Sequence, residues 1–304
     1  MIRKTRGRRA VTLLELLIVV SIIGILFAVI VPAVQAAREA VRRTTCGNNL
    51  HQVGVAIHSF ESSRGSLPGI DDAQPRPLER YRSLSISGQL ASFLSGGDAL
   101  TSKIDEWKQD QEERAVAAPA VLLCPSDPEA YGSAVSYRYN QGSSPPRGWG
   151  NGVFSHLRMT TAQVGDGLAQ TAFVAERVVY RQSIDSLKHP GSMYLTVDDQ
   201  DLSPADCIAL NKSGFGTLAA QAAGDDWLWA DWKHSAYLHW FRPNTGWHDC
   251  TRKVDFSALI TARSYHPGGV HVLFGDGSVR FVDDTIDLGA WRAMGTRQQT
   301  DRTQ

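Results

Sequence analysis

The chain has 304 residues, of which 42% are hydrophobic and 20% are charged, so it can bury a sizeable core. Lys and Arg total 31, and so do Asp and Glu. Residues 1–10 hold five of the basic residues and no acidic one, which leaves 26 basic against 31 acidic residues, a net charge of −5, in the rest of the chain. This balance argues against nucleic acid as a partner, because proteins that bind it concentrate basic residues on one face.

Residues 11–31 form an apolar run whose only charged residue is Glu15. As a helix this run would be roughly 31 Å long, close to the ~30 Å hydrocarbon core of a bilayer. Val, Ile and Leu lie on all of its faces, whereas a helix of a soluble protein keeps a polar side. We therefore predict a membrane span over 11–31. The positive-inside rule keeps residues 1–10 in the cytoplasm and places the chain beyond the span outside the inner membrane, in the periplasm or on a surface filament.

A small residue, Ala10, precedes this run, whereas a secretory signal has its cleavage site after the apolar region. The arrangement resembles the type IV prepilin leader of pilins and type II secretion pseudopilins, which is cut before the apolar run and leaves Glu as the fifth residue. A cut after Ala10 makes Val11 the first residue and Glu15 the fifth. The family usually has Gly in place of Ala10 and Phe in place of Val11. The resemblance implies prepilin peptidase and other pilin-like subunits as partners.

Glu15 also has a physical argument of its own. A carboxylate inside a span costs about 2.5–3.5 kcal/mol or more, and such residues usually serve a function with a partner. Cleavage would create an α-ammonium on Val11, and the resemblance implies that this group pairs with Glu15 of a neighbouring subunit during assembly. The alternative is that Glu15 only snorkels toward the cytoplasmic interface.

Apolar residues continue at helical spacing beyond Pro32 and predict an amphipathic helix over 32–62, in which Gly47-Asn48-Asn49 weakens the middle and allows a break. The expected fold class is α+β, with this long N-terminal helix packed on an antiparallel, β-rich, pilin-like head. The expected parts are a leader (1–10), a span (11–31), the amphipathic helix (32–62) and an extracytoplasmic head (63–304).

Within the head, apolar spacing and turn residues predict further elements. Glu176 and Arg177 are expected on the polar side of their strand or at an irregularity in it. The predicted helices cover 89–94, 99–116 and 287–294, and the predicted strands cover 120–123, 135–139, 171–180, 270–274 and 278–282, the last two forming a hairpin.

Four cysteines lie beyond the span, where an oxidising compartment permits two disulfides in three possible connectivities. We favour Cys46–Cys124 and Cys207–Cys250, with free buried thiols as the alternative. No C-x-x-C sequence is present, so a zinc ribbon or a thioredoxin-like site is not expected.

Two further stretches could bind ligands. Trp227, Trp229 and Trp232 belong to a dense aromatic stretch, which either builds the core or exposes a surface on which sugar rings of a polysaccharide stack. The core interpretation is the default. The acidic residues 198–206 could hold calcium, but their spacing matches no EF-hand, and a solvated loop is favoured.

His266, nine intervening residues and Asp276-Gly277 form the H-x9-DG pattern of a large bacterial family of unknown function, domain of unknown function 1559. The chain resembles that family over nearly its whole length, and the pattern lies in the C-terminal segment of about 264–295. The resemblance implies a pilin-like, membrane-anchored extracytoplasmic protein and no established chemistry. The other shared motifs are C-x-N-N-L (46–50), C-P-S-D (124–127), N-G-V-F (151–154) and A-E-R (175–177).

His266 and Asp276 could form a catalytic pair, but no G-x-S-x-G or comparable nucleophile motif accompanies them. A structural role is favoured, with Asp276 bonding within its own turn and His266 fixing the loop before the hairpin. We therefore expect a pilin-like structural subunit, not an enzyme, that assembles through its N-terminal helix. The alternative function is a membrane-anchored surface module that binds glycans or other ligands.

Overall fold

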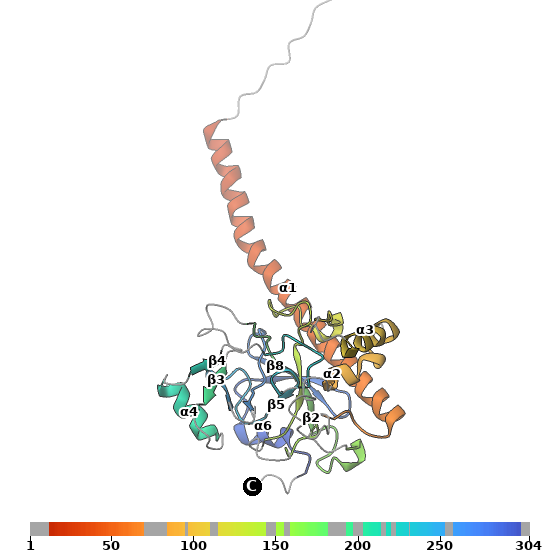
Figure 1. Ribbon diagram of the computed structural model, residues 1–304. Helices are drawn as coiled ribbons and strands as arrows, with labels where there is room; N and C mark the ends of the chain where they lie inside the picture. The colour runs from red at the N-terminus through yellow and green to blue at the C-terminus, as the bar shows by residue number, and fades with distance from the viewer. Residues whose placement is uncertain are drawn as a thin grey trace, which may run out of the picture. The chain divides into compact units, whose positions relative to one another are not determined.

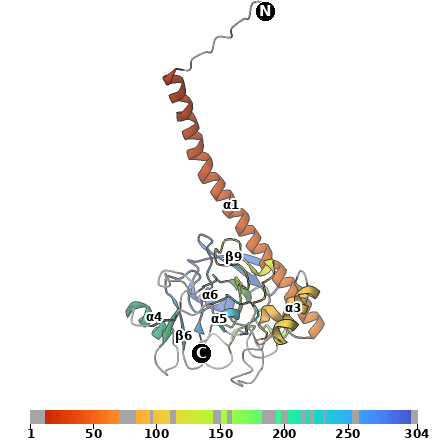
Figure 2. The ribbon, with the colours of Figure 1, turned by 45° about the horizontal axis from the view of Figure 1, so that its top comes forward.

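The chain divides into two compact units in a computed structural model, one up to Arg42 and one that begins at Arg43. Figures 1 and 2 show the elements of both. The structure describes residues 12–69, 84–94, 97–109, 115–143, 150–154, 159–181, 193–196, 203–213, 217–219, 223–230, 232–252 and 258–298.

A single helix, α1 (Leu13–Arg64), runs for 52 residues. It continues through Pro32, as a helix can where other groups take up the lost hydrogen bond, and through residues 47–49 without the break that their sequence allows. It ends before Gly65, whose φ of 74° suits glycine and whose N–H bonds to the carbonyl oxygen of Glu61 at 2.7 Å.

The part of α1 that begins at Arg43 belongs to the core of the head. Its apolar side chains recur every three or four residues and are fully buried. Gly54 allows a close approach, because a Cβ there would lie 2.9 Å from the side chain of Leu273. The buried positions of α1 are Cys46, Leu50, Val53, Gly54, Ala56 and Ile57.

A five-stranded sheet forms the centre of the head, in the order β5-β1-β2-β8-β9. Neighbouring strands are antiparallel, except that β1 and β5 are parallel. Leu273 belongs to the same core cluster as α1, while Val272 and Phe274 pack in a second cluster with Trp291. Both faces of β8 are therefore covered. The strands are β1 (Tyr137–Asn140), β2 (Ala172–Glu176), β5 (Ala236–Tyr237), β8 (Gly269–Phe274) and β9 (Val279–Asp283).

A second sheet has four strands in the order β4-β3-β6-β7, and β3 and β6 pair in parallel. A disulfide between Cys207 and Cys250 ties α4 (Pro204–Ser213) to β6. The head thus combines antiparallel and parallel pairings in both sheets. The strands are β3 (Met193–Thr196), β4 (Thr217–Ala219), β6 (Asp249–Arg252) and β7 (Ala258–Leu259).

The C-terminal hairpin and its closing helix are confirmed. Gly277, with φ of 82°, occupies the turn between β8 and β9, where only glycine adopts the backbone freely. The helix α6 (Leu288–Gly295) begins after Asp287, whose side chain accepts a hydrogen bond from the N–H of Ala290 at 2.9 Å.

Several predicted element boundaries are wrong. The strand expected over 120–123 is a 3₁₀-helix at Ala120–Leu122, because a short apolar run does not distinguish the two structures. The strand expected over 171–180 stops as β2 at Glu176, and the helix expected over 99–116 is α3 (Gly97–Gln109). The remaining short elements are α2 (Ile86–Gln89), α5 (Trp232–Ser235) and 3₁₀-helices at Ala91–Phe93 and Thr161–Gln163.

Candidate functional site

The first turn of α1 holds Glu15 against Thr12. Oε2 of Glu15 accepts hydrogen bonds from the backbone N–H and the hydroxyl of Thr12, at 2.8 and 2.9 Å. The N–H of Glu15 in turn donates to the Thr12 hydroxyl at 3.2 Å. This is a capping box, in which threonine and glutamate together satisfy the free N–H groups of a helix start. The expected cleavage site, Ala10 and Val11, lies outside the described residues.

Among the described residues, α1 alone is long and apolar enough to cross a membrane, a test that rests on length and composition. None of its most apolar 18-residue window is buried in the protein. Exposed Leu, Ile, Val and Phe side chains follow one another from Leu13 to Val31. Such a surface is costly in water and suits lipid or other apolar helices.

A second group of functional side chains lies inside the head, around Glu176 at the end of β2. Its Oε1 lies 3.2 Å from Nε2 of His266 and 3.1 Å from Nδ1 of His271. Its Oε2 accepts the backbone N–H of His271 at 2.7 Å. All three side chains are nearly inaccessible to solvent, with at most 10% of any one exposed.

The sheet brings these residues together. Ala175 on β2 pairs with Val272 on β8. Because the two strands are antiparallel, Glu176, which follows Ala175, lies opposite His271, which precedes Val272. His266 reaches the same carboxylate from the loop before β8. Burial by itself would raise the pKa of Glu176, but hydrogen bonds from His266 and His271 and their charges outweigh it and lower the pKa. Glu176 is therefore a carboxylate, and each ring nitrogen facing it donates.

The disulfide between Cys46 of α1 and Cys124 borders this cluster, with Cα atoms 5.0 Å apart. Sγ of Cys124 lies 3.6 Å from Nε2 of His266 and 4.0 Å from Oε1 of Glu176. Gly47 lies beside the His271 ring, and an added Cβ at position 47 would be in ordinary van der Waals contact with it, at 3.4 Å. The long helix, the disulfide and the His–Glu–His cluster thus form one buried centre.

The chain matches two families in comparisons with known proteins. Residues 35–289 match the family described as a protein of unknown function, DUF1559, and residues 5–31 match the prokaryotic N-terminal methylation motif. The chain belongs to the DUF1559 family. No curated protein and no solved structure matches it. The methylation motif together with α1 gives this DUF1559 protein a prepilin-like N-terminus with a membrane anchor.

Motifs far apart in this DUF1559 sequence meet at the buried centre. C-x-N-N-L supplies Cys46, C-P-S-D supplies Cys124, A-E-R supplies Glu176, and the H-x9-DG pattern supplies His266. We expected Glu176 and Arg177 on the polar side of their strand or at an irregularity in it. The polar-side alternative is wrong, because they are only 2% and 1% exposed, and β2 ends at Glu176.

Buried partners compensate the charge of Arg177 as well. Its Nη2 lies 2.6 Å from Oδ2 of Asp249, whose Oδ1 lies 3.0 Å from Nη2 of Arg263. Sequence reasoning missed this triad and the role of His271. The available signal was the charged pair Glu176-Arg177 at the end of an otherwise apolar run, FVAER.

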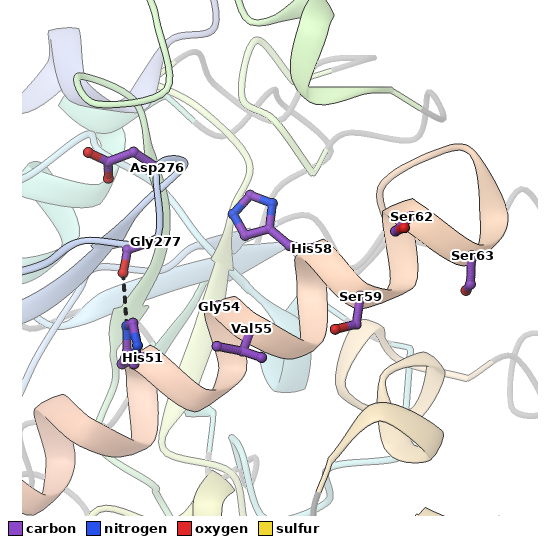
Figure 3. Close-up of a pocket in the computed structure, with 9 residues that line it drawn as sticks. All are labelled: His51, Gly54, Val55, His58, Ser59, Ser62, Ser63, Asp276 and Gly277. Carbon is purple, nitrogen blue, oxygen red and sulfur yellow. Dashed lines mark hydrogen bonds between the residues drawn. The ribbon is translucent and has the colours of Figure 1, made fainter.

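Asp276 and Gly277 lie away from the buried cluster, in the turn after β8. Oδ1 of Asp276 accepts the N–H and the hydroxyl of Ser278 at 2.9 and 2.6 Å, and both hydrogen bonds stay within its own turn. The carbonyl oxygen of Gly277 lies 3.1 Å from Nδ1 of His51 on α1 (Figure 3). The described hydrogen bonds do not join His266 to Asp276. A shallow groove of about 610 Å³ runs beside this turn along α1.

The described tryptophan side chains support the core interpretation, which was the default, over a stacking surface. Trp227 is fully buried and donates from Nε1 to the carbonyl oxygen of Val116 at 2.9 Å, so it cannot stack on a ligand. Trp229 is partly buried and packs edge-on against His234, with ring centroids 5.5 Å apart. The side chain of Trp232 lies outside the described residues.

The acidic stretch expected as a candidate calcium loop is only partly described, from residue 203 onward. Asp206 belongs to the first turn of α4, and its Oδ2 accepts the N–H of Ser203 at 3.1 Å. The hydroxyl of Ser203 accepts the N–H of Asp206 in return at 3.1 Å, so the carboxylate is part of a capping box at the start of α4.

The two disulfides join the same pairs that we favoured from the sequence, Cys46–Cys124 and Cys207–Cys250.

Proposed function

We propose that this protein is a pilin-like structural subunit of the inner membrane, which prepilin peptidase cuts after Ala10 and which then assembles with other pilin-like subunits. The observation that carries the proposal is the methylation motif over residues 5–31, which ends inside the exposed, apolar part of α1. The DUF1559 match over residues 35–289 follows almost directly, so the head is built onto a prepilin-type start.

The proposed mechanism is assembly and not turnover. Apolar segments such as 13–31 pack against one another in a filament, either a type II secretion pseudopilus or a type IV pilus. Thr12 holds Glu15 at the helix start through Oε2. An apolar surrounding disfavours an uncompensated carboxylate, so the α-ammonium of Val11 from a neighbouring subunit is a favourable partner. This pairing would set the register between subunits.

Mass spectrometry of the membrane-extracted protein tests the processing step. We expect an intact mass that begins at Val11 and carries one added methyl group. Replacing Ala10 by a large charged residue, as in Ala10→Glu, is expected to leave the unprocessed mass. A mass that retains residues 1–10 in the unaltered protein would overturn the proposal.

Cross-linking in membranes tests the assembly step. We expect Glu15→Gln to be processed normally and to lose most cross-linked multimers, because the amide carries no charge for the neighbouring ammonium. Glu39→Gln is the matched control, since Glu39 also lies on α1 but pairs with Arg42 of its own helix at 2.8 Å. Equal multimer yields for both variants would contradict the role of Glu15.

A further inference from the structure

The buried centre contains an unusual set of metal-binding side chains. One ligand atom from each of Cys46, Cys124, Glu176 and His266 lies within 4.8 Å of all the others. Among the described residues this is the only group of its kind. All four residues are buried, so a bound ion would be shielded from water.

We propose that these four side chains bind a zinc ion when the Cys46–Cys124 disulfide is reduced. Two thiolates, one imidazole and one carboxylate match the ligands and the coordination number of tetrahedral zinc. In such a site the two sulfurs lie roughly 3.8 Å apart, because each Zn–S bond is about 2.3 Å long. A disulfide bond is about 2 Å long, so the two sulfurs need to separate by less than ~2 Å when it opens.

The chemistry of the exchange balances. A dithiol reductant gives two electrons and two protons to the Cys46–Cys124 bond, becomes a disulfide itself and leaves two thiols on the protein. Zinc then displaces the two thiol protons and binds the thiolates. Nε2 of His266, which now faces Oε1 of Glu176 at 3.2 Å, binds the ion instead, with its ring proton on Nδ1. In the reverse direction, a disulfide oxidant takes two electrons from the two thiolates and two protons from solvent and becomes a dithiol, the Cys46–Cys124 bond re-forms, and the ion is released.

Groups around the four ligands already hold the carboxylate in place. His271 donates its backbone N–H to Oε2 of Glu176 at 2.7 Å and approaches Oε1 with Nδ1 at 3.1 Å. The hydroxyl of Tyr137 donates to the carbonyl oxygen of Cys46 at 3.2 Å. Partners of this kind orient metal ligands, and their loss typically weakens binding about 10–100-fold. The inference does not depend on the filament role.

Cobalt is the spectroscopic probe for this site. The full chain is purified in detergent under nitrogen with dithiothreitol, its four thiols are counted, and it is desalted and titrated with Co²⁺. We expect one equivalent to give a thiolate-to-cobalt charge-transfer band and tetrahedral visible bands. The oxidised protein is expected to give neither. Absence of these bands from the reduced chain would overturn the proposal.

Paired variants locate the ligands. Cys207→Ser/Cys250→Ser, which removes the other disulfide, is expected to keep the bands, whereas Cys46→Ser/Cys124→Ser is expected to lose the charge-transfer band. His266→Ala is expected to weaken Co²⁺ affinity at least about 10-fold. Circular dichroism shows whether that variant folds. If it does not, X-ray absorption of the zinc form decides: two sulfur and two nitrogen or oxygen neighbours support the site, and four sulfurs contradict it.

Discussion

His271 binds Glu176 twice, through its backbone N–H to Oε2 at 2.7 Å and through its ring Nδ1 to Oε1 at 3.1 Å. The carboxylate of Glu176, at the end of β2, thereby accepts the His271 N–H of β8 where a backbone carbonyl would normally accept it. The carboxylate also joins His266, so one buried charge links both strands to the loop before the hairpin.

Replacing Glu176 by glutamine should destabilise the head by about 3 kcal/mol. The amide keeps the shape, but its NH₂ group must face an N–H donor of His271 or His266, which leaves a buried donor unpaired. Urea unfolding of the full chain in detergent, followed by tryptophan fluorescence, measures the change. Glu106→Gln, an exposed change on α3, is the control and should stay within about 0.5 kcal/mol. Equal effects of the two changes would contradict the role of Glu176.

His239 should make the head less stable in mild acid. Burial lowers its pKa from 6.5 to about 3, and the neutral ring bonds to Tyr237 and to the carbonyl oxygen of Trp291, each at 2.8 Å. Below pH 6.5 the unfolded chain takes up a proton at this residue and the folded chain does not. The free energy of unfolding should therefore fall by about 2 kcal/mol from pH 6.5 to pH 5 through this residue alone.

The variant His239→Gln tests this slope, because glutamine does not titrate. Between pH 6.5 and pH 5, the free energy of unfolding of the variant should fall by about 2 kcal/mol less than that of the unaltered protein. Identical slopes for the two proteins would show that His239 does not carry the effect.

Gly277→Ala should cost about 1–2 kcal/mol. The cost comes from the backbone alone, because φ is 82° and an added Cβ would meet nothing within 4 Å. Gly246→Ala is the matched control, since that position is equally open but has no positive φ, and it should be nearly neutral. Thermal unfolding of both variants checks the difference. A neutral Gly277→Ala would mean that the turn relaxes into another conformation.

Removal of the Cys46–Cys124 disulfide by a double Ala substitution should destabilise the chain by about 4 kcal/mol or more. Loop entropy predicts about the same loss for Cys207–Cys250, because the two loops span 78 and 43 residues. The first pair should cost more, since its loss also opens space beside His266 and Glu176. Denaturant unfolding of the two double variants decides. A larger loss at Cys207–Cys250 would contradict this assignment.

Local patterns in the sequence were enough to predict the long helix and the C-terminal hairpin. In the helix, the spacing of the apolar residues agrees with the final packing. In the hairpin, the alternating residues of β8 and β9 and the Asp-Gly turn between them agree with it. The strand expected over 120–123 failed, because four apolar residues between Pro119 and Cys124 fit a 3₁₀-turn equally well.

The buried charges could not be predicted, since their partners come from distant parts of the chain. Glu176 meets His271 across 95 residues, and Arg177 meets Asp249 across 72. A charged residue normally indicates a solvated face, and only these tertiary partners make its burial favourable. The same holds for His266: Asp276, the other end of its motif, bonds to Ser278 in a separate turn.

The position of the Cys46–Cys124 bond matters for how the chain would respond to pulling. Cys46 lies three residues after Arg43, where the head unit begins, and Cys124 follows 78 positions later in the sequence. A force applied through α1 would pass from Cys46 to Cys124 through the disulfide bond. The segment between these two cysteines would then carry none of that force. Residues 47–123 would then stay shielded from extension even where the packing of Arg43–Arg64 within the head gives way.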